Sequence, residues 1–320
     1  FTLIYHNDPI REYDNYSRLL LLVPLYIFFR SFKLDNNILL LLIYLITFTS
    51  MLFYLISPAE SINLRYSGSS NLPITYGNMI MSLIIFTMIF ISFYKNNKKL
   101  LFNIISLILL IYLWSITGTR GSLIGFLLSM VFILIISRNT RLMKSLIISL
   151  FILVFVSSQL PIKDRLATLY KSISIDSDYS DRSLMEREYM IKKSLNIIKE
   201  NSLLGVGSKN YENIISFSQK PFDHEFKMPH AHNDFIDLSA KYGMITALLF
   251  LLIFLGPIYV AYSSCVTNNT IYSYLCLGHL ISNMGFMLTQ TLFAHHQSTI
   301  IFIIYLYVFL SQVVREKYNE

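Results

Sequence analysis

The chain has 320 residues, of which 54% are apolar and only 14% are charged, and its mean hydropathy is +0.53. Because soluble domains are usually about 25% charged, this composition excludes an ordinary water-soluble protein. The formal net charge of +7 does not indicate nucleic-acid binding, since the basic residues cluster beside apolar runs. Cys265 and Cys276 lie in or beside such runs, so they predict neither a disulfide framework nor a metal site.

Long apolar runs dominate the chain, and most approach the roughly 20 residues that a membrane-spanning helix needs. Helices are the expected form, because lipid offers no water to satisfy backbone groups. In chain order, the runs cover residues 19–32, 37–57, 77–94, 100–117, 122–137, 145–160, 242–263, 271–292 and 297–314. The predicted fold is therefore all-α, a polytopic membrane bundle. Since the first residue is Phe1 rather than methionine, a further amino-terminal membrane portion is expected to precede it.

Basic residues in the short loops predict the orientation of these helices, because cytoplasmic loops are enriched in lysine and arginine. If every run spans once, four basic clusters share one side: residues 30–33, 95–99, 138–144 and 315–317. The opposite, outward side then holds residues 1–18, 58–76, 118–121, 161–241 and 294–296. The predicted division is membrane helices at 1–160, an outward insert at 161–241 and membrane helices at 242–320.

The insert is predicted to contain a helix. Ser183-Leu-Met-Glu186 has the pattern of a capping box, and Gly205-Val-Gly207 that of a glycine stop. Apolar residues follow the capping box at helical spacing: Leu184, Ile191, Leu195 and Ile198. On a helical wheel, Arg187 borders this stripe on one edge and Glu188 on the other. With the stripe facing the bundle, Arg187 is expected to point along the outer rim of the bundle.

Arg120 stands in Thr117-Gly-Thr-Arg-Gly-Ser122, between two apolar runs with almost no loop. A charge at such a depth is costly unless it is paired or lines a cavity. One interpretation is an arginine whose guanidinium extends to the lipid headgroups. The other is an anion-binding arginine in a cavity open to the outer face. The flanking glycines would let a ligand approach the backbone closely.

Two histidines lie at the end of the insert, in Pro229-His-Ala-His-Asn-Asp-Phe235. They lack carboxylate or cysteine partners at a zinc-site spacing, so neither a metal nor another cofactor is expected. An imidazole can take a hydroxyl proton near neutral pH, which makes His230 and His232 candidate general bases. Asn233 or Asp234 would then orient the base. The alternative interpretation is an interfacial, hydrogen-bonded histidine pair.

Two further outward segments carry polar residues. Arg65 precedes the run Ser67–Gly77, whose glycine and proline content is ordinary loop chemistry. His295 and His296 fall on the same side and are expected to have an interfacial role.

Arg120, Arg187 and the histidines of the insert thus share one predicted face. Two arginines and a base suit the displacement of a pyrophosphate leaving group without a metal. Guanidinium groups bind phosphate oxygens in bidentate fashion and stabilise the departing anion.

Five short segments agree in order, spacing and side with motifs of one family. They are Arg65–Gly77, which ends in Pro-x-x-x-Gly; Thr119–Ser122; Arg187 with Leu203–Gly207; His230–Asn233 with Lys241–Gly243; and Leu288–His295. In these segments the chain resembles the O-antigen ligase and polymerase superfamily of bacterial lipopolysaccharide assembly, most closely the O-antigen ligases. The similarity extends over residues 16–314.

The resemblance implies a GT-C-like helical bundle with a helical periplasmic insert, in the bacterial inner membrane and with its active site facing the periplasm. It implies metal-independent, inverting transfer of a glycan from an undecaprenyl-pyrophosphate carrier to a lipid A–core sugar hydroxyl, among membrane lipids. His232 would activate the acceptor hydroxyl. Arg120 and Arg187 would bind the donor pyrophosphate, and further substrate contacts would come from Arg65, His230 and Asn233.

Two other functions stay open. A Wzy-type polymerase would use the same donor but extend the glycan itself, and only the segment Leu288–His295 favours a ligase over it. A transporter or flippase would bury charge near the bilayer midplane, often at broken helices in two related halves. The candidate residues instead gather toward one face, and the sequence has no visible repeated halves, which favours an enzyme.

Overall fold

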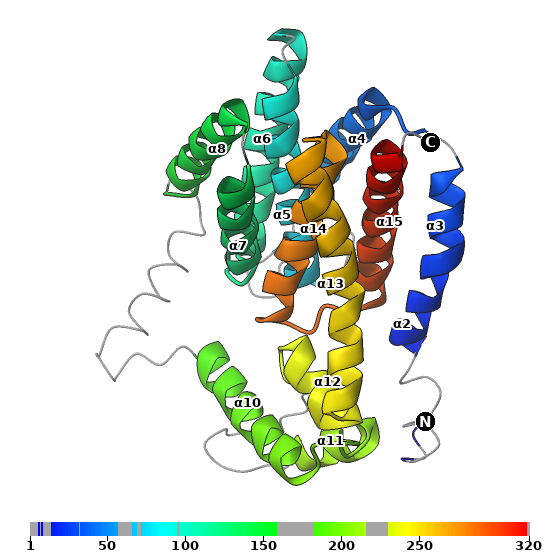
Figure 1. Cartoon of the computed structure of the whole chain (residues 1–320). Helices are drawn as coiled ribbons and strands as arrows, with labels where there is room; N and C mark the ends of the chain where they lie inside the picture. The colour runs from blue at the N-terminus through cyan, green and yellow to red at the C-terminus, as the bar shows by residue number, and fades with distance from the viewer. Residues whose placement is uncertain are drawn as a thin grey trace. The chain divides into compact units, whose positions relative to one another are not determined.

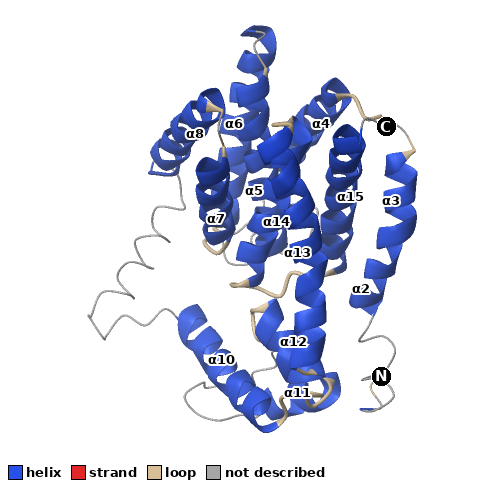
Figure 2. Ribbon diagram, in the orientation of Figure 1, coloured by secondary structure: helices blue, strands red, loops and turns tan. Residues whose placement is uncertain are grey.

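The computed structural model describes residues 6, 8, 14–31, 33–56, 66–68, 72–94, 97–137, 139–158, 182–215 and 230–318. Helices account for most of them, and these residues contain no strand (Figures 1 and 2). The all-α prediction is therefore confirmed. The helices group into two compact units.

The larger unit, named the bundle unit, comprises Leu21–Tyr170, Pro257–Phe286 and Ile300–Glu320. Its helices are α3 (Leu22–Arg30), α4 (Asn36–Ile56), α5 (Pro73–Phe93), α6 (Asn97–Thr117), α7 (Ser122–Ile136), α8 (Thr140–Ser158), the second part of α13 (Met244–Thr267), nearly all of α14 (Ile271–Met287) and most of α15 (His296–Tyr318). Helix α5 packs against α4, α6, α7 and α8 (Figure 1). Almost every α5 side chain is buried, so this helix is packed on most of its sides.

Five helices in the described part of the chain are long and apolar enough to cross a membrane by length and composition: α4, α5, α6, α13 and α15. Each predicted apolar run overlaps a helix, but the run ends near residues 242 and 292 are wrong. The run 271–292 was expected to be helical throughout, yet α14 stops at Met287 and the following residues are irregular. The run beginning at residue 242 is broken at once, because Gly243 separates α12 (Asp234–Tyr242) from α13.

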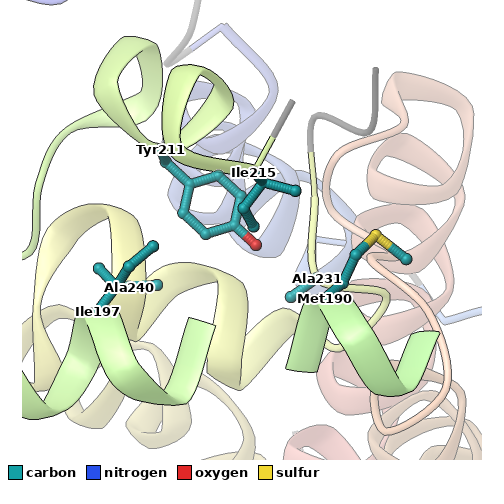
Figure 3. Packing of buried hydrophobic residues seen from close by; sticks show 6 residues of the cluster. All are labelled: Met190, Ile197, Tyr211, Ile215, Ala231 and Ala240. Atoms are coloured by element: carbon teal, nitrogen blue, oxygen red, sulfur yellow. The ribbon is translucent and has the colours of Figure 1, made fainter. Parts of the chain in front are cut away.

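The other unit, named the insert unit, comprises Phe1–Leu20, Lys171–Gly256 and Met287–Thr299. Its helices are α2 (Asp14–Ser17), most of the 3-10 turn η2 (Arg18–Leu21), α10 (Arg182–Glu200), α11 (Ser208–Ile215), α12 and the first part of α13. Helix α12 packs against both α10 and α11. These helices and Ala231, two residues before Asn233, share a small core, named the insert core and shown in Figure 3: Met190, Ile197, Tyr211, Ile215, Ala231 and Ala240.

The packed face of α10 differs from the predicted one. Met190, Ser194 and Ile197 are buried, whereas Leu195 is 49% exposed. Ser194 is accommodated because its hydroxyl donates to the Met190 carbonyl oxygen at 2.7 Å and lies 2.8 Å from the Tyr211 hydroxyl. A hydrophobic pattern does not mark a buried serine, so the predicted stripe is displaced by about one position. The partners of this face are α11 and α12, where the prediction had the membrane helices.

Residues 202–207 and 240–244 form a backbone clasp, held by hydrogen bonds of 2.8 to 3.0 Å. Gly243 has a φ of +88°, and a Cβ at this position would lie 1.9 Å from the Leu203 carbonyl oxygen. Only glycine permits both the conformation and the close approach. Because α10 already ends at Glu200, the glycines of residues 205–207 serve this clasp instead of closing the helix as predicted.

Candidate functional site

His230, Ala231 and His232 form a bend just before α12, named the histidine bend. The ring centroids of the two histidines are 4.6 Å apart in an edge-to-face arrangement. His232 has a φ of +53°, a left-handed conformation that is uncommon outside glycine. Ala231 is fully buried in the insert core (Figure 3). The bend is thus anchored at its middle residue, with a half-buried imidazole on either side.

Asn233 caps the first turn of α12. Its Oδ1 accepts hydrogen bonds from the Phe235 and Ile236 N–H groups, at 3.0 and 3.1 Å. Its Nδ2 donates to the Leu288 carbonyl oxygen at 3.2 Å. Asparagine is among the preferred residues at this position because its side chain satisfies N–H groups that have no helical partner. All of these bonds go to backbone atoms, so Asn233 fixes the start of the helix and does not orient an imidazole as expected.

Asp234 joins α12 to the segment between α14 and α15. Its carboxylate is fully buried and accepts the N–H groups of Leu292 and Phe293, at 2.7 and 3.4 Å. The segment is therefore held against the histidine bend, and the ring of His295 lies 6.0 Å from that of His230, between centroids. His295, which was predicted to be interfacial, is part of this cluster. Asp234 itself binds backbone and does not orient a base.

Burial lowers the pKa of all three clustered imidazoles. The pKa falls to about 4 at His230 and to about 3 at His232, and it is also lowered at His295. After burial, the neighbouring His230, the Arg187 guanidinium and His295 further disfavour protonation of His232. The imidazoles are therefore neutral near pH 7, which is the form that can accept a proton.

Arg187 lies one turn before Met190 and is half-buried, close enough to His232 for its charge to lower the pKa of that imidazole. The next residue, Glu188, is exposed and pairs with Lys192. The two residues thus have different environments in the structure, a difference that the helical wheel did not predict. It also places Arg187 toward the histidine bend, where the prediction had a position on an outer rim. A guanidinium beside neutral imidazoles is a suitable place for an anion.

In the bundle unit, Arg120 is half-buried in a hydrogen-bonded turn between α6 and α7. Trp114 Nε1 donates to the Thr119 carbonyl oxygen at 3.2 Å, and Thr119 Oγ1 donates to the Pro73 carbonyl oxygen at 3.1 Å. A Cβ on Gly77 would lie only 2.5 Å from Thr119 Oγ1. The Pro-x-x-x-Gly segment and the segment that contains Arg120 therefore pack directly together.

The structure brings most of the predicted site residues into one unit. The insert unit gathers Arg187, His230, His232 and Asn233, while Arg120 belongs to the bundle unit. Convergence of Arg120 and Arg187 on one pyrophosphate stays a prediction. Arg65 lies outside the described residues. Over the described ranges, no group of three or more histidine, cysteine or acidic side chains is arranged to hold a metal ion.

Sequence reasoning missed Asp237 and Lys241, which are both buried in α12 and form an ion pair at 2.9 Å. An acid and a base four residues apart on a helix ordinarily indicate a solvated pair. The sequence signal that could have marked them is helical periodicity, since Asp234, Asp237 and Lys241 fall on one face of the helix that follows the histidine bend.

Comparisons with known proteins find two sequence similarities. Residues 105–251 match the family model described as O-antigen ligase, a stretch that contains Arg120, Arg187 and the histidine bend. This stretch is similar to the O-antigen ligase family. A Haemophilus influenzae protein, described as uncharacterized, is 26% identical over 324 residues, which cover 94% of this chain and 79% of that protein.

Five described helices are long and apolar enough to cross a membrane, as in a multi-pass membrane protein, and the match to the O-antigen ligase model supports a ligase- or polymerase-type function. The segment Leu288–His295 lies beyond the matched residues. Asp234 nevertheless holds it against the histidine bend, so the sequence segment that favours a ligase and the two candidate bases occupy one site.

Proposed function

We propose that the protein is an O-antigen ligase that transfers a glycan from undecaprenyl pyrophosphate to a sugar hydroxyl of lipid A–core, at the periplasmic face of the inner membrane and without a metal. The observation that carries this proposal is the pair of neutral imidazoles in the histidine bend, together with the half-buried Arg187, whose charge acts on His232. A fixed positive charge for the leaving group and a proton acceptor for the attacking hydroxyl are the two groups that the transfer needs.

In the proposed reaction, the His232 imidazole accepts the proton of the acceptor hydroxyl. The hydroxyl oxygen attacks the anomeric carbon of the donor from the side opposite the pyrophosphate. The bond between that carbon and the phosphate oxygen breaks, and undecaprenyl pyrophosphate leaves with the electron pair, so the configuration inverts. Arg187 and Arg120 stabilise the negative charge that develops on the leaving group.

The low pKa of His232 links base strength to donor binding. An imidazole with a pKa of about 3 is a weak base, and the Arg187 guanidinium contributes to that weakness. A bound pyrophosphate would offset the positive charge of Arg187 and raise the pKa of His232 toward neutrality. The proton acceptor is then strongest when the donor is in place.

A Wzy-type polymerase is the second candidate, because it would use the same donor and the same arginines. It differs in its acceptor, which would be a second carrier-linked glycan. The segment Leu288–His295 favours the ligase because it carries the resemblance to ligases, and its His295 ring lies against the His230 ring of the histidine bend.

Deletion of the gene tests the proposal. Loss of a ligase leaves bare lipid A–core and long glycans stranded on the carrier lipid, as seen on silver-stained gels and by mass spectrometry of extracted lipids. Loss of a polymerase leaves lipid A–core that carries a single repeat unit, and this result would replace the ligase proposal with the second candidate. Complementation with the wild-type gene should restore full-length lipopolysaccharide, whereas His232→Ala at the same protein level should not.

A further inference from the structure

A buried ion pair lies behind the histidine bend. Asp237 and Lys241 are one turn apart on α12, with side chains only 1% and 10% exposed, and their charged atoms Oδ2 and Nζ are 2.9 Å apart. Removing two charges from water is costly, and such a pair often stabilises a fold no better than apolar residues of the same size. Its presence beside the candidate bases therefore calls for a role other than stability.

The second carboxylate oxygen of Asp237 holds the histidine bend. Oδ1 accepts the N–H of Ala231 at 2.9 Å, and Ala231 is the residue between the two histidines. The Nζ of Lys241 lies 4.9 Å from the ring centroid of Tyr211, a cation–π contact with a residue of the insert core. Asp237 thus connects the middle of the bend to α12 and, through Lys241, to α11.

This connection acts on a strained backbone. The left-handed conformation of His232 is unfavourable for a non-glycine residue and persists only when the surroundings hold it. Asp237 holds the residue before His232, and the cap of α12 holds the residue after it. The relative position of the two imidazoles therefore depends on the Ala231 N–H bond.

We propose that Asp237 is a positioning residue, which sets the His230 and His232 imidazoles through its hydrogen bond to Ala231, with Lys241 as its buried counter-ion. The catalytic part of this inference rests on the proposed function. Loss of the acceptor oxygen at residue 237 frees the bend and moves both rings, although Asp237 itself touches no substrate. The carboxylate matters as an acceptor of one backbone N–H, and Lys241 matters because it neutralises the charge of that acceptor.

Two double variants separate the acceptor from the charge. Asp237→Asn with Lys241→Met removes both charges and keeps an oxygen that can accept the Ala231 N–H. Asp237→Leu with Lys241→Met also removes both charges but offers no acceptor at a similar side-chain volume. The two proteins differ only at residue 237, where an amide that can accept the N–H is replaced by methyl groups that cannot, so each serves as the matched control for the other.

The first readout needs no substrate. Diethylpyrocarbonate modification of His230 and His232, mapped by mass spectrometry on protein in lipid nanodiscs, should proceed at the wild-type rate in the asparagine variant. In the leucine variant, His230 should react ~10-fold faster, because a buried hydrogen bond that holds its neighbour is lost. This result does not depend on the proposed reaction, so its failure and the failure of the ligase proposal are distinguishable.

The second readout is steady-state transfer. The leucine variant should lose ~100-fold in kcat with little change in KM for the donor, as expected when reacting groups are misplaced. The asparagine variant should stay within about twofold of wild type, because it keeps the acceptor. Equal modification rates in the two variants, or a tenfold loss of kcat in the asparagine variant at an unchanged thermal midpoint, would overturn the proposal. If the leucine variant does not insert, the asparagine variant alone decides.

Discussion

Substitutions of Asn233 can show whether this residue supports the histidine bend or contacts the substrate. Asn233→Ala removes the two bonds to the first turn of α12 and the bond to the Leu288 carbonyl oxygen. Loss of the cap costs about 1 kcal/mol, and loss of the exposed bond to Leu288 adds roughly 0.5 to 1 kcal/mol. Asn233→Ser keeps a capping oxygen but cannot reach Leu288, so it should lose only the second, smaller contribution.

The assay is hydrogen exchange of the Phe235 and Ile236 amides, followed by mass spectrometry on protein in nanodiscs. A local loss of about 1.5 to 2 kcal/mol predicts exchange faster by about 10- to 30-fold in Asn233→Ala, and by about threefold in Asn233→Ser. Transfer activity should follow the same order. If Asn233 instead contacts substrate, the serine variant will be as inactive as the alanine variant while its exchange stays slow. That outcome would refute the reasoning.

Three further predictions concern the charge, the bases and the clasp. Arg187→Ala should abolish transfer at matched protein level, and Arg187→Lys should recover little because an ammonium cannot form a bidentate fork. The control Glu188→Ala, at the exposed neighbouring residue, should stay active. Normal surface glycan from Arg187→Ala would remove this arginine from the mechanism. The pKa of His232 is about 3 in the folded protein and 6.5 ordinarily, so the unfolded state binds more protons between these pH values. The thermal midpoint should therefore fall as the pH drops from 6.5 toward 4. This decline should be smaller in His232→Gln. Gly243→Ala should lower the thermal midpoint sharply in detergent. The control Gly256→Ala should not, because its Cβ would meet no atom within 4 Å. Equal midpoints in the two variants would contradict a stabilising role of the backbone clasp.

The helices of this protein could be predicted from sequence because lipid leaves few alternatives for an apolar run. The exceptions have specific causes. Residues 288–292 were expected to continue the helical run, yet the Asp234 carboxylate, distant in sequence, accepts the N–H groups of Leu292 and Phe293. Ser194 lies on the packed face of α10 because the hydroxyl of Tyr211, on the next helix α11, satisfies it. Such partners become visible only when the chain is folded.

The candidate site divides in the same way. Arg187 and the two histidines of the bend could be singled out, because charges and imidazoles at the edge of apolar runs are unusual. The geometry that positions these side chains could not be predicted from the sequence. Asp237 and Lys241 have the spacing of an ordinary surface pair, and only the structure shows them buried, with a carboxylate oxygen on the Ala231 N–H. Nor does a sequence indicate that residues 202–207 and 240–244 meet through their backbones.

The most direct test of the central claim is glycan transfer by the purified protein. The full chain is reconstituted in nanodiscs with undecaprenyl-pyrophosphate-linked glycan and lipid A–core, in the presence of EDTA, and the lipid products are identified by mass spectrometry. The account predicts lipid A–core that carries the glycan, free undecaprenyl pyrophosphate, and no product with His232→Ala. Elongated glycan on the carrier with unmodified lipid A–core, or activity that EDTA abolishes and a divalent ion restores, would contradict it.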